Sequence, residues 1–206
     1  MARTATTATA ASKGLSRPLT PAGERLLDAA SALFYDRGIR AVGVDLIAAV
    51  AGTTKKTLYD RFGSKDGLVV LYLQRRQQRW REFVERHLDE MGGAGTPARA
   101  LGVLDALQSW MAEQHRGCAF VNAYAELGGS EHPAVEVIRD EKQWTHALYL
   151  RLCDEGGLAD PAEVAAGLHL VHEGVLVLTT AGGRPDAFAD GRHAAERLLA
   201  AVGHGP

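Results

Sequence analysis

The sequence predicts an all-α fold of about nine helices, and three observations support this. Apolar side chains recur at intervals of three and four residues along most of the 206-residue chain, and no alternating apolar and polar pattern indicates a β-strand. Glycine and proline residues recur where one such pattern ends and the next begins. A hydrophobic share of 46% allows one medium-sized domain, or a small and a larger one, to bury a core.

Charge divides the chain into two parts. Residues 1–86 contain 15 Lys and Arg against 8 Asp and Glu, a net charge of +7, whereas residues 87–206 contain 8 against 17, a net charge of −9. The formal total of −2 therefore combines two opposed parts. We expect the basic part to meet a polyanion and the acidic part to avoid it.

Composition and motifs exclude several classes of protein. No apolar run approaches the roughly 18 to 20 residues of a membrane-spanning helix, and the N-terminus lacks an apolar signal segment, so we expect a cytoplasmic protein without a membrane partner. The two cysteines, Cys118 and Cys153, are too few for a disulfide framework. Because no glycine-rich phosphate loop or nucleophile elbow is present, we expect neither an enzyme nor a cofactor.

The first helix is predicted to follow a mildly basic segment rich in Ala, Thr and Ser, residues 1–19, which we interpret as a flexible tail. Thr20 can cap the free amides at the start of the helix, and Pro21 has the backbone geometry of a first helical residue. Gly38 ends the helix. Its core-facing side chains are expected to be Leu26, Ala30, Leu33 and Phe34.

A short second helix is predicted over residues 44–51 and a third over residues 54–62, with Gly52 between them. Thr53 or Thr54 can cap the third helix. The side chains expected to face the core from these two helices are Leu46 or Ile47, Val50, Leu58 and Phe62.

A long fourth helix is predicted from a cap at Ser64 to Glu90 or Met91, before the sequence MGGAGT at residues 91–96. Its inward stripe is expected to consist of Leu68, Tyr72, Trp80, Phe83, Val84, His87 and Leu88. Five further helices are predicted, with Asp160 and Glu163 resembling a capping box at the start of the fourth of these. They cover residues 96–117, 118–127, 133–155, 161–181 and 185–202.

Two short helices inside a basic region, with a longer helix before them, make a helix-turn-helix. We expect the second of the pair to present Thr54, Lys55, Lys56, Thr57 and Tyr59 outward. Hydroxyl and lysine side chains at the start of a helix can reach base edges, whereas Tyr59 and Lys65 suit phosphate oxygens. Double-stranded DNA is therefore the expected partner.

Residues 39–68, IRAVGVDLIAAVAGTTKKTLYDRFGSKDGL, resemble the TetR (tetracycline-repressor-like) family of bacterial transcription regulators. The shared pattern is IA and AG, two small residues, a basic residue, TLY, an aromatic residue and SK. The resemblance implies base-facing roles for Thr54, Lys55, Lys56 and Thr57, and backbone-contacting roles for Tyr59 and Lys65. It also implies a C-terminal helical domain that senses a ligand and dimerises.

The chain departs from the family pattern at two positions. Gly43 stands where the family often has a hydroxyl cap that touches phosphate, which puts one phosphate contact in doubt. Lys56 stands where the family often has glycine, which indicates an extra basic contact and a different operator. The stretch GCAFVNAYAE, residues 117–126, resembles one subtype of ligand-sensing domain but identifies no ligand.

The predicted helix over residues 161–181 has two apolar faces. One face is expected to pack on the core, and its members are Val164, Leu168, Val171, Val175 and Leu178. The other consists of Leu170, Gly174, Val177 and Ala181. Because two apolar faces need two partners, we predict that the last two helices form a four-helix interface across the two-fold axis of a homodimer. The last helix would contribute Phe188, Ala195, Leu198, Leu199 and Val202.

His169, His172 and Glu173 share one face of the same helix. They could bind a metal, line a hydrogen-bonded pocket, or lie at the dimer seam, and we expect no metal because no second ligand cluster completes a coordination shell. An apolar effector cavity could be lined by Trp110, Gln114, Phe120, Asn122, Tyr124, Trp144, Leu148, His169 and Glu173, although each aromatic residue could instead be simple core.

These observations predict a DNA-binding transcriptional regulator with a helix-turn-helix domain over residues 20–66 and an effector-binding and dimerisation domain over residues 67–206. The family resemblance implies a repressor that a small molecule releases from its operator. A metal-responsive regulator that uses His169, His172 and Glu173 is one alternative, and a helical enzyme acting on a small molecule is another. The sequence identifies neither the effector nor the operator.

Overall fold

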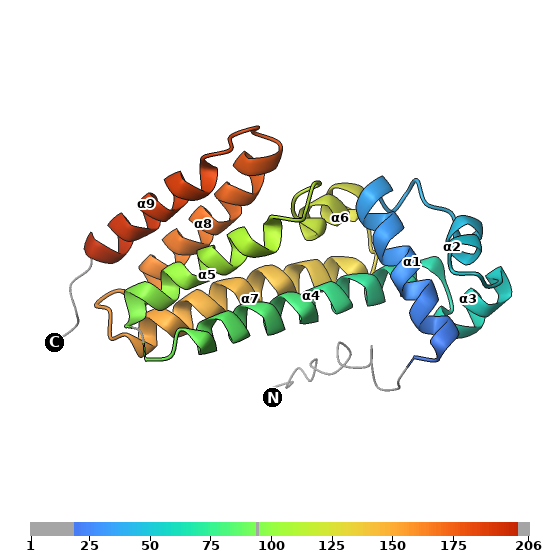
Figure 1. The fold of residues 1–206 in the computed structure, drawn as a ribbon, viewed down its shortest axis with the longest axis horizontal. Coiled ribbons are helices and arrows are strands. Elements are labelled where there is room, and N and C mark those ends of the chain that lie inside the picture. Colours follow the sequence, from blue (N-terminus) through green and yellow to red (C-terminus); the bar gives the residue numbers. More distant parts are fainter. Residues whose placement is uncertain (1–18, 94, 202–206) are drawn as a thin grey trace, which may run out of the picture. The chain divides into compact units, whose positions relative to one another are not determined.

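The computed structural model describes residues 19–93 and 95–201, and this part of the chain contains nine α-helices and no β-strand (Figure 1). The predicted all-α fold is confirmed. The predicted tail, apart from Leu19, and Val202 lie outside the described residues. The helices are α1 (Pro21–Arg37), α2 (Val44–Val50), α3 (Lys55–Phe62), α4 (Lys65–Glu90), α5 (Thr96–Met111), α6 (Ala119–Leu127), α7 (Ala134–Glu155), α8 (Pro161–Thr180) and α9 (Ala187–Ala201).

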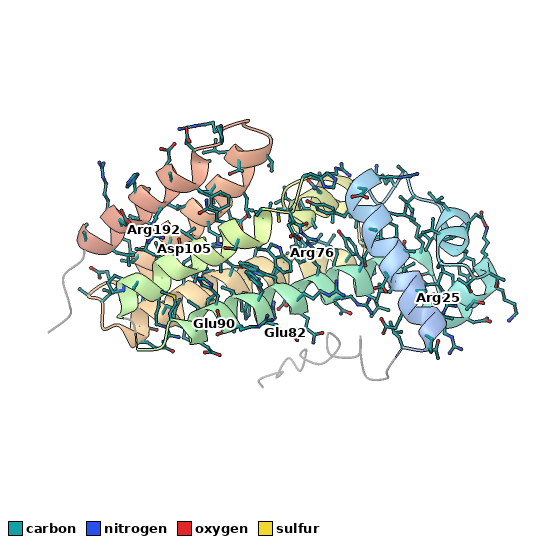
Figure 2. All side chains as sticks on the ribbon, viewed as in Figure 1. Arg25, Arg76, Glu82, Glu90, Asp105 and Arg192 are labelled. Atoms are coloured by element: carbon teal, nitrogen blue, oxygen red, sulfur yellow. The ribbon has the colours of Figure 1, made fainter. Side chains whose placement is uncertain are left out.

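The helices belong to two compact units, and the division falls inside α4, after Gln74. In the first unit α1 packs against α2 and α3. Thr20 caps α1 as predicted, because its Oγ1 accepts a hydrogen bond from the Gly23 N–H at 3.3 Å. Arg25, labelled in Figure 2, donates from Nε to the Ala51 carbonyl at 3.2 Å and ties α1 to the end of α2. The buried core of this unit includes Leu26, Leu27, Phe34, Ile47, Leu58 and Leu68.

In the second unit α7 and α8 pack together, α8 lies beside α9, and α5 contacts both α7 and α9 (Figure 1). An ion pair between Arg192 of α9 and Asp105 of α5 adds to this packing (Figure 2). The short helix α6 packs on α7. Fully buried side chains of this unit include Val84, Leu88, Val103, Tyr149, Leu152 and Leu168.

The fifth helix is shorter than predicted, because α5 ends at Met111 rather than near residue 117. The chain then turns and reaches Gly117, whose backbone φ of 74° is in the left-handed region. A Cβ atom at Gly117 would lie 2.9 Å from the Thr180 side chain of α8. The close approach to α8 therefore requires both the left-handed backbone and the missing side chain that glycine provides.

Three predicted side-chain roles are wrong. Val50 does not lock α2 into the core, because it lies on the solvent face with 59% of its surface exposed while Ile47 is fully buried. Leu178, in the last turn of α8, is 38% exposed rather than core. Asp160 forms no side-chain cap on α8, because its φ of −128° and ψ of 67° are not those of an extended capping residue.

By length and composition alone, α8 could cross a membrane, with 20 residues and a mean hydropathy of 1.2. In sequence this helix is not an unbroken apolar run, because Glu163, His169, His172 and Glu173 interrupt it. Only 33% of its most apolar stretch is buried inside the described structure. An apolar helix of this kind needs a second partner besides its own core.

Candidate functional site

The start of α3 is fixed by local hydrogen bonds. Thr54 has the extended backbone of an N-cap, and its Oγ1 accepts from the Thr57 N–H at 3.1 Å. The two threonine hydroxyls are 2.9 Å apart. On the inner face of α3, Leu58 is fully buried and Phe62 nearly so. Since the inner face is anchored, the polar residues at the start of α3 are held on the outer surface.

The two lysines of α3 lie on that surface and each pairs with a carboxylate of the same unit. Lys55 Nζ is 3.2 Å from Asp45 Oδ2, and Lys56 Nζ is 2.7 Å from Asp60 Oδ2. The Lys56 side chain is 84% exposed. Exposed pairs of this kind contribute only about 0–1 kcal/mol, so a polyanion can replace the carboxylates at little cost.

The remaining predicted contact residues of the first unit lie close by in sequence. Tyr59 is 43% exposed. Lys65, at the start of α4, places its ammonium 5.9 Å from the centre of the Phe34 ring. Ser64 accepts from the Gly67 N–H at 2.9 Å and so occupies one amide of the α4 N-terminus. Gly43, which precedes α2, provides no side-chain cap, as its departure from the family pattern implies.

The second unit contains a cavity of about 40 Å³, room for a few water molecules. Of the nine residues predicted for an effector pocket, Trp110 and Phe120 line it. The other lining residues are Arg76, Trp80, Leu107, Met111, Cys118, Ala119, Glu141, Lys142, Thr145, His172 and Leu176.

The other seven predicted pocket residues do not line this cavity. Gln114 accepts a hydrogen bond from Arg76 at 3.0 Å (Arg76 is labelled in Figure 2). Asn122 donates to the Arg116 carbonyl, and Tyr124 is 47% exposed. Leu148 is buried in the core, and the Arg81 guanidinium lies 4.8 Å from the centre of the Trp144 ring.

His169, His172 and Glu173 of α8 have different surroundings. His172 is buried and its Nδ1 lies 3.2 Å from the Tyr149 hydroxyl. Burial lowers the pKa of His172 to about 3, so the imidazole is neutral. The Glu173 carboxylate is held by Lys142, with both oxygens 2.8 Å from Nζ. His169 Nε2 lies 3.6 Å from the same carboxylate.

Glu173 stays ionised despite its position. Burial alone would raise its pKa, but the nearby His169 side chain and the charge of Lys142 lower it to about 2. Within the described residues, no group of three His, Cys, Asp or Glu side chains could hold a metal ion.

Glu141 is the buried charge that sequence reasoning missed. Its surface is 3% exposed, and Oε2 accepts from Arg81 Nε at 3.2 Å while Oε1 has no hydrogen-bond partner. Burial raises the pKa of Glu141 to about 7, against the opposing effects of Arg81, Lys142 and Gln77. One signal was present in the sequence, because Glu141 lies three residues after Ile138 and seven before Leu148, on the apolar face of α7.

Both the helix-turn-helix region and the overall fold resemble known proteins. Residues 26–71 match the family model described as bacterial regulatory proteins, tetR family. Over 51 residues the chain is 51% identical to the HTH-type transcriptional activator FasR of Mycolicibacterium smegmatis. That match covers 25% of this chain and 23% of the relative, so it includes less than two thirds of the relative's length.

The likeness to solved structures extends over most of the chain. A TetR-family transcriptional regulator from Streptomyces coelicolor has a TM-score of 0.81 and 27% identity, covering 88% of this chain and 96% of that one. A putative TetR transcriptional regulator from Streptomyces avermitilis has a TM-score of 0.71 and 30% identity, covering 86% and 99% respectively. The similarity therefore includes the second unit as well as the helix-turn-helix.

Proposed function

Because the chain belongs to the TetR family of bacterial regulatory proteins, we propose that it is a homodimeric DNA-binding transcriptional repressor that a small-molecule effector releases from its operator. The observation that carries this proposal is the start of α3, where the Thr54 cap holds two exposed lysines and Thr57 on the outer face of an anchored helix. A helix presented in this way fits the major groove of B-DNA.

Within this proposal, Thr54, Lys55, Lys56 and Thr57 contact base edges. Tyr59 and Lys65 contact phosphate oxygens, which fix the register of the head but carry no sequence information. On binding, DNA phosphates replace Asp45 and Asp60 as the partners of the two α3 lysines. This exchange makes binding dependent on salt, since each phosphate contact releases counterions.

The dimer forms through the last two helices. On α8, Leu170 is 74% exposed and Val177 is 49% exposed, and Gly174 between them has nothing within 4 Å of the position of a Cβ atom. An open apolar stripe of this kind is stabilised when a second copy covers it. Two copies place two recognition helices in successive major grooves, roughly 34 to 36 Å apart.

Oligomeric state tests this interface. We expect the protein to be a dimer by light scattering at micromolar concentration, and Leu170→Glu with Val177→Glu to produce a folded monomer. Val121→Glu on α6, where the native side chain is 40% exposed, is the matched control and should remain dimeric. A wild-type monomer would contradict the proposal.

Effector binding to the second unit favours a spacing of the two heads that no longer fits the operator. The relative FasR bears the name of an activator, but its match is confined to about a quarter of this chain and concerns the helix-turn-helix. We therefore propose repression because most members of the TetR family are repressors. Measuring transcription from the regulated promoter in cells with and without the gene distinguishes the two. Higher transcription without the gene indicates a repressor, and lower transcription indicates an activator.

Two substitutions separate base contacts from phosphate contacts. Losing a base contact should relax specificity at one operator position, at a cost of about 1–3 kcal/mol, whereas losing a phosphate contact should weaken all sequences alike. The affinities of Lys55→Ala and Lys56→Ala for a set of single-base operator variants show which kind of contact each lysine makes. Arg139→Ala on the exposed face of α7 removes the same charge from the second unit and is the control.

We place this regulator in the cytoplasm with the DNA it binds, and we assign it no catalytic role. Turnover of a small molecule by a preparation that fails to bind DNA would reverse that assignment.

A further inference from the structure

The cavity of the second unit has mostly aromatic and apolar walls. The rings of Trp80 and Trp110 are tilted by 60° with their centres 5.7 Å apart, and Phe120 adds a third ring. Met111, Leu107 and Leu176 complete the apolar wall. Aromatic walls of this kind favour a planar aromatic ligand, since rings pack well in tilted and offset arrangements.

One residue that lines the cavity has an acceptor without a hydrogen-bond partner. Glu141 Oε1 is buried in a residue that lines the cavity, while Oε2 is occupied by Arg81. A buried carboxylate oxygen without a hydrogen bond is costly, and a donor on a ligand removes that cost. Thr145 does not meet this need, because its hydroxyl donates to the Glu141 backbone carbonyl at 3.1 Å.

The charges around the cavity disfavour a cationic donor. Arg76 and Lys142 line the cavity, and Arg81 lies against Glu141 from outside it. Although burial alone would lower it, the pKa of Lys142 is raised by Cys118 and Glu173, so its ammonium keeps its charge. Among the charged residues that line the cavity, Arg76 and Lys142 are cations and Glu141 is the one carboxylate, so an added positive charge is disfavoured.

We propose that Glu141 is the polar anchor of this cavity and that the ligand is an uncharged aromatic molecule whose hydroxyl or N–H group donates to Glu141 Oε1, a phenol being the simplest case. This inference rests on the proposed release by a small-molecule effector. A ring needs more room than about 40 Å³, since a cavity that holds benzene measures roughly 150 Å³. Met111, the last residue of α5, and Cys118, at the far end of the non-helical residues 112–118, are the wall residues that move to provide it.

An isosteric pair of probes tests the donor. Isothermal titration calorimetry with 2-naphthol and 2-methylnaphthalene compares molecules that differ by a hydroxyl in place of a methyl group. At pH 8.5, above the Glu141 pKa of about 7, the carboxylate is charged, and we expect the full-length protein to prefer 2-naphthol by roughly tenfold or more, as a hydrogen bond to a charged acceptor allows. Glu141→Met should abolish the preference while leaving affinity for 2-methylnaphthalene equal or higher.

Two further variants keep the test decisive. Glu141→Gln retains an uncharged acceptor and should keep only part of the preference, and it replaces Glu141→Met if that variant does not fold by circular dichroism. Glu136→Met, at an exposed position of the same helix, should bind as the wild type does. Three results would overturn the proposal: equal affinity for the two probes, no binding of either probe, or a preference for 2-naphthol that persists in Glu141→Met. So would tighter binding of protonated 2-naphthylmethylamine than of 2-naphthol.

DNA release separates this inference from the function on which it rests. If the preference for 2-naphthol depends on Glu141 but 2-naphthol leaves the protein bound to its operator, the ligand site stands and the proposed release falls. If another compound releases the protein from DNA and the wild type shows no preference for the donor, the release stands and the ligand site falls.

Discussion

The two units of the protein place their charged residues in opposite surroundings. In the first unit, Lys55 and Lys56 pair with carboxylates at the surface, and the Lys56 side chain is 84% exposed. In the second unit, Glu141 is 3% exposed, and the side chains of Lys142 and Glu173 are 27% and 29% exposed. The two α3 lysines therefore lie at the surface, whereas these three charged residues of the second unit are partly or fully buried.

The exposed and buried charges therefore differ in how much stability changes when they exchange partners. A surface ion pair can exchange its carboxylate for a DNA phosphate with little change in stability. Removing a buried charge from water costs free energy, so the stability of the fold changes strongly when such a charge loses or gains a partner. The head is therefore suited to reversible contact with a polyanion, and the second unit is suited to detecting a molecule that changes its internal hydrogen bonds.

The largest expected effect concerns pH and Glu141. Its pKa of about 7 in the folded protein lies above the ordinary value of 4.5, so the folded state holds the proton more tightly. The stability that this provides is complete below about pH 4.5 and is lost as the pH rises toward 7. Relative to the wild type, Glu141→Met should therefore gain up to about 3 kcal/mol between pH 4.5 and pH 8.

Urea unfolding at both pH values measures this gain. Because His172 and Glu173 titrate in both proteins, the difference between the two isolates Glu141. Glu136→Met is the exposed control and should show a constant difference from the wild type. A pH-independent difference for Glu141→Met would mean that the buried carboxyl does not change its ionisation on folding.

The next effect compares one substitution in both units. Lys142→Met leaves the Glu173 carboxylate without its main partner, and we expect a loss of about 2 kcal/mol, less than for a fully buried pair because both side chains are partly exposed. Lys56→Met, in an exposed pair, should change stability by about 0.5 kcal/mol or less. Chemical denaturation of both variants checks this, and equal losses would remove the contrast between the units.

A smaller effect is expected at the cap of the recognition helix. Thr54→Ala removes the acceptor for the Thr57 N–H and should cost about 1 kcal/mol of stability. Thr53→Ala, next to the cap, is the control. Thermal unfolding followed by circular dichroism distinguishes them, and an equal, negligible change in both would show that Thr54 does not hold α3 in place.

The smallest effect is a gain. Gly43 precedes α2 with an extended backbone and open space where a Cβ would lie, so a serine fits without strain. Gly43→Ser adds a hydroxyl cap and should stabilise the first unit by a few tenths of a kcal/mol, roughly 0.3. It should also strengthen DNA binding if the hydroxyl reaches a phosphate. Gly43→Ala supplies the side chain without the hydroxyl and should give neither gain.

The two units also differed in what sequence could predict. Thr54 and Gly63 bound α3 through contacts within a few residues, so local patterns were enough to predict this helix and its exposed side chains. The partner of Glu141 is Arg81, 60 residues away on another helix, and no local pattern specifies that pairing. Of the predicted pocket residues, Trp110 and Phe120 line the cavity of the second unit, and the effector site itself stays a prediction.

Boundaries that depend on distant packing were missed as well. The turn at Gly117, which follows α5, lies against Thr180 of α8, and α6 and α7 separate the two in sequence. Likewise, Val50 and Leu178 fit a helical apolar pattern, but the short α2 and the last turn of α8 leave them at the surface. An apolar pattern indicates a face, and only packing decides whether that face is covered.

Fluorescence anisotropy with DNA fragments from beside the protein's own gene tests the central claim most directly. The account predicts tight binding to one fragment, a steep fall in affinity as salt increases, and a shallower salt slope for the Lys55→Ala and Lys56→Ala double variant. The Arg139→Ala control should bind as the wild type does. Binding to no neighbouring fragment, or binding that salt and the α3 lysines leave unchanged, would contradict the assignment of α3 as the DNA-reading helix.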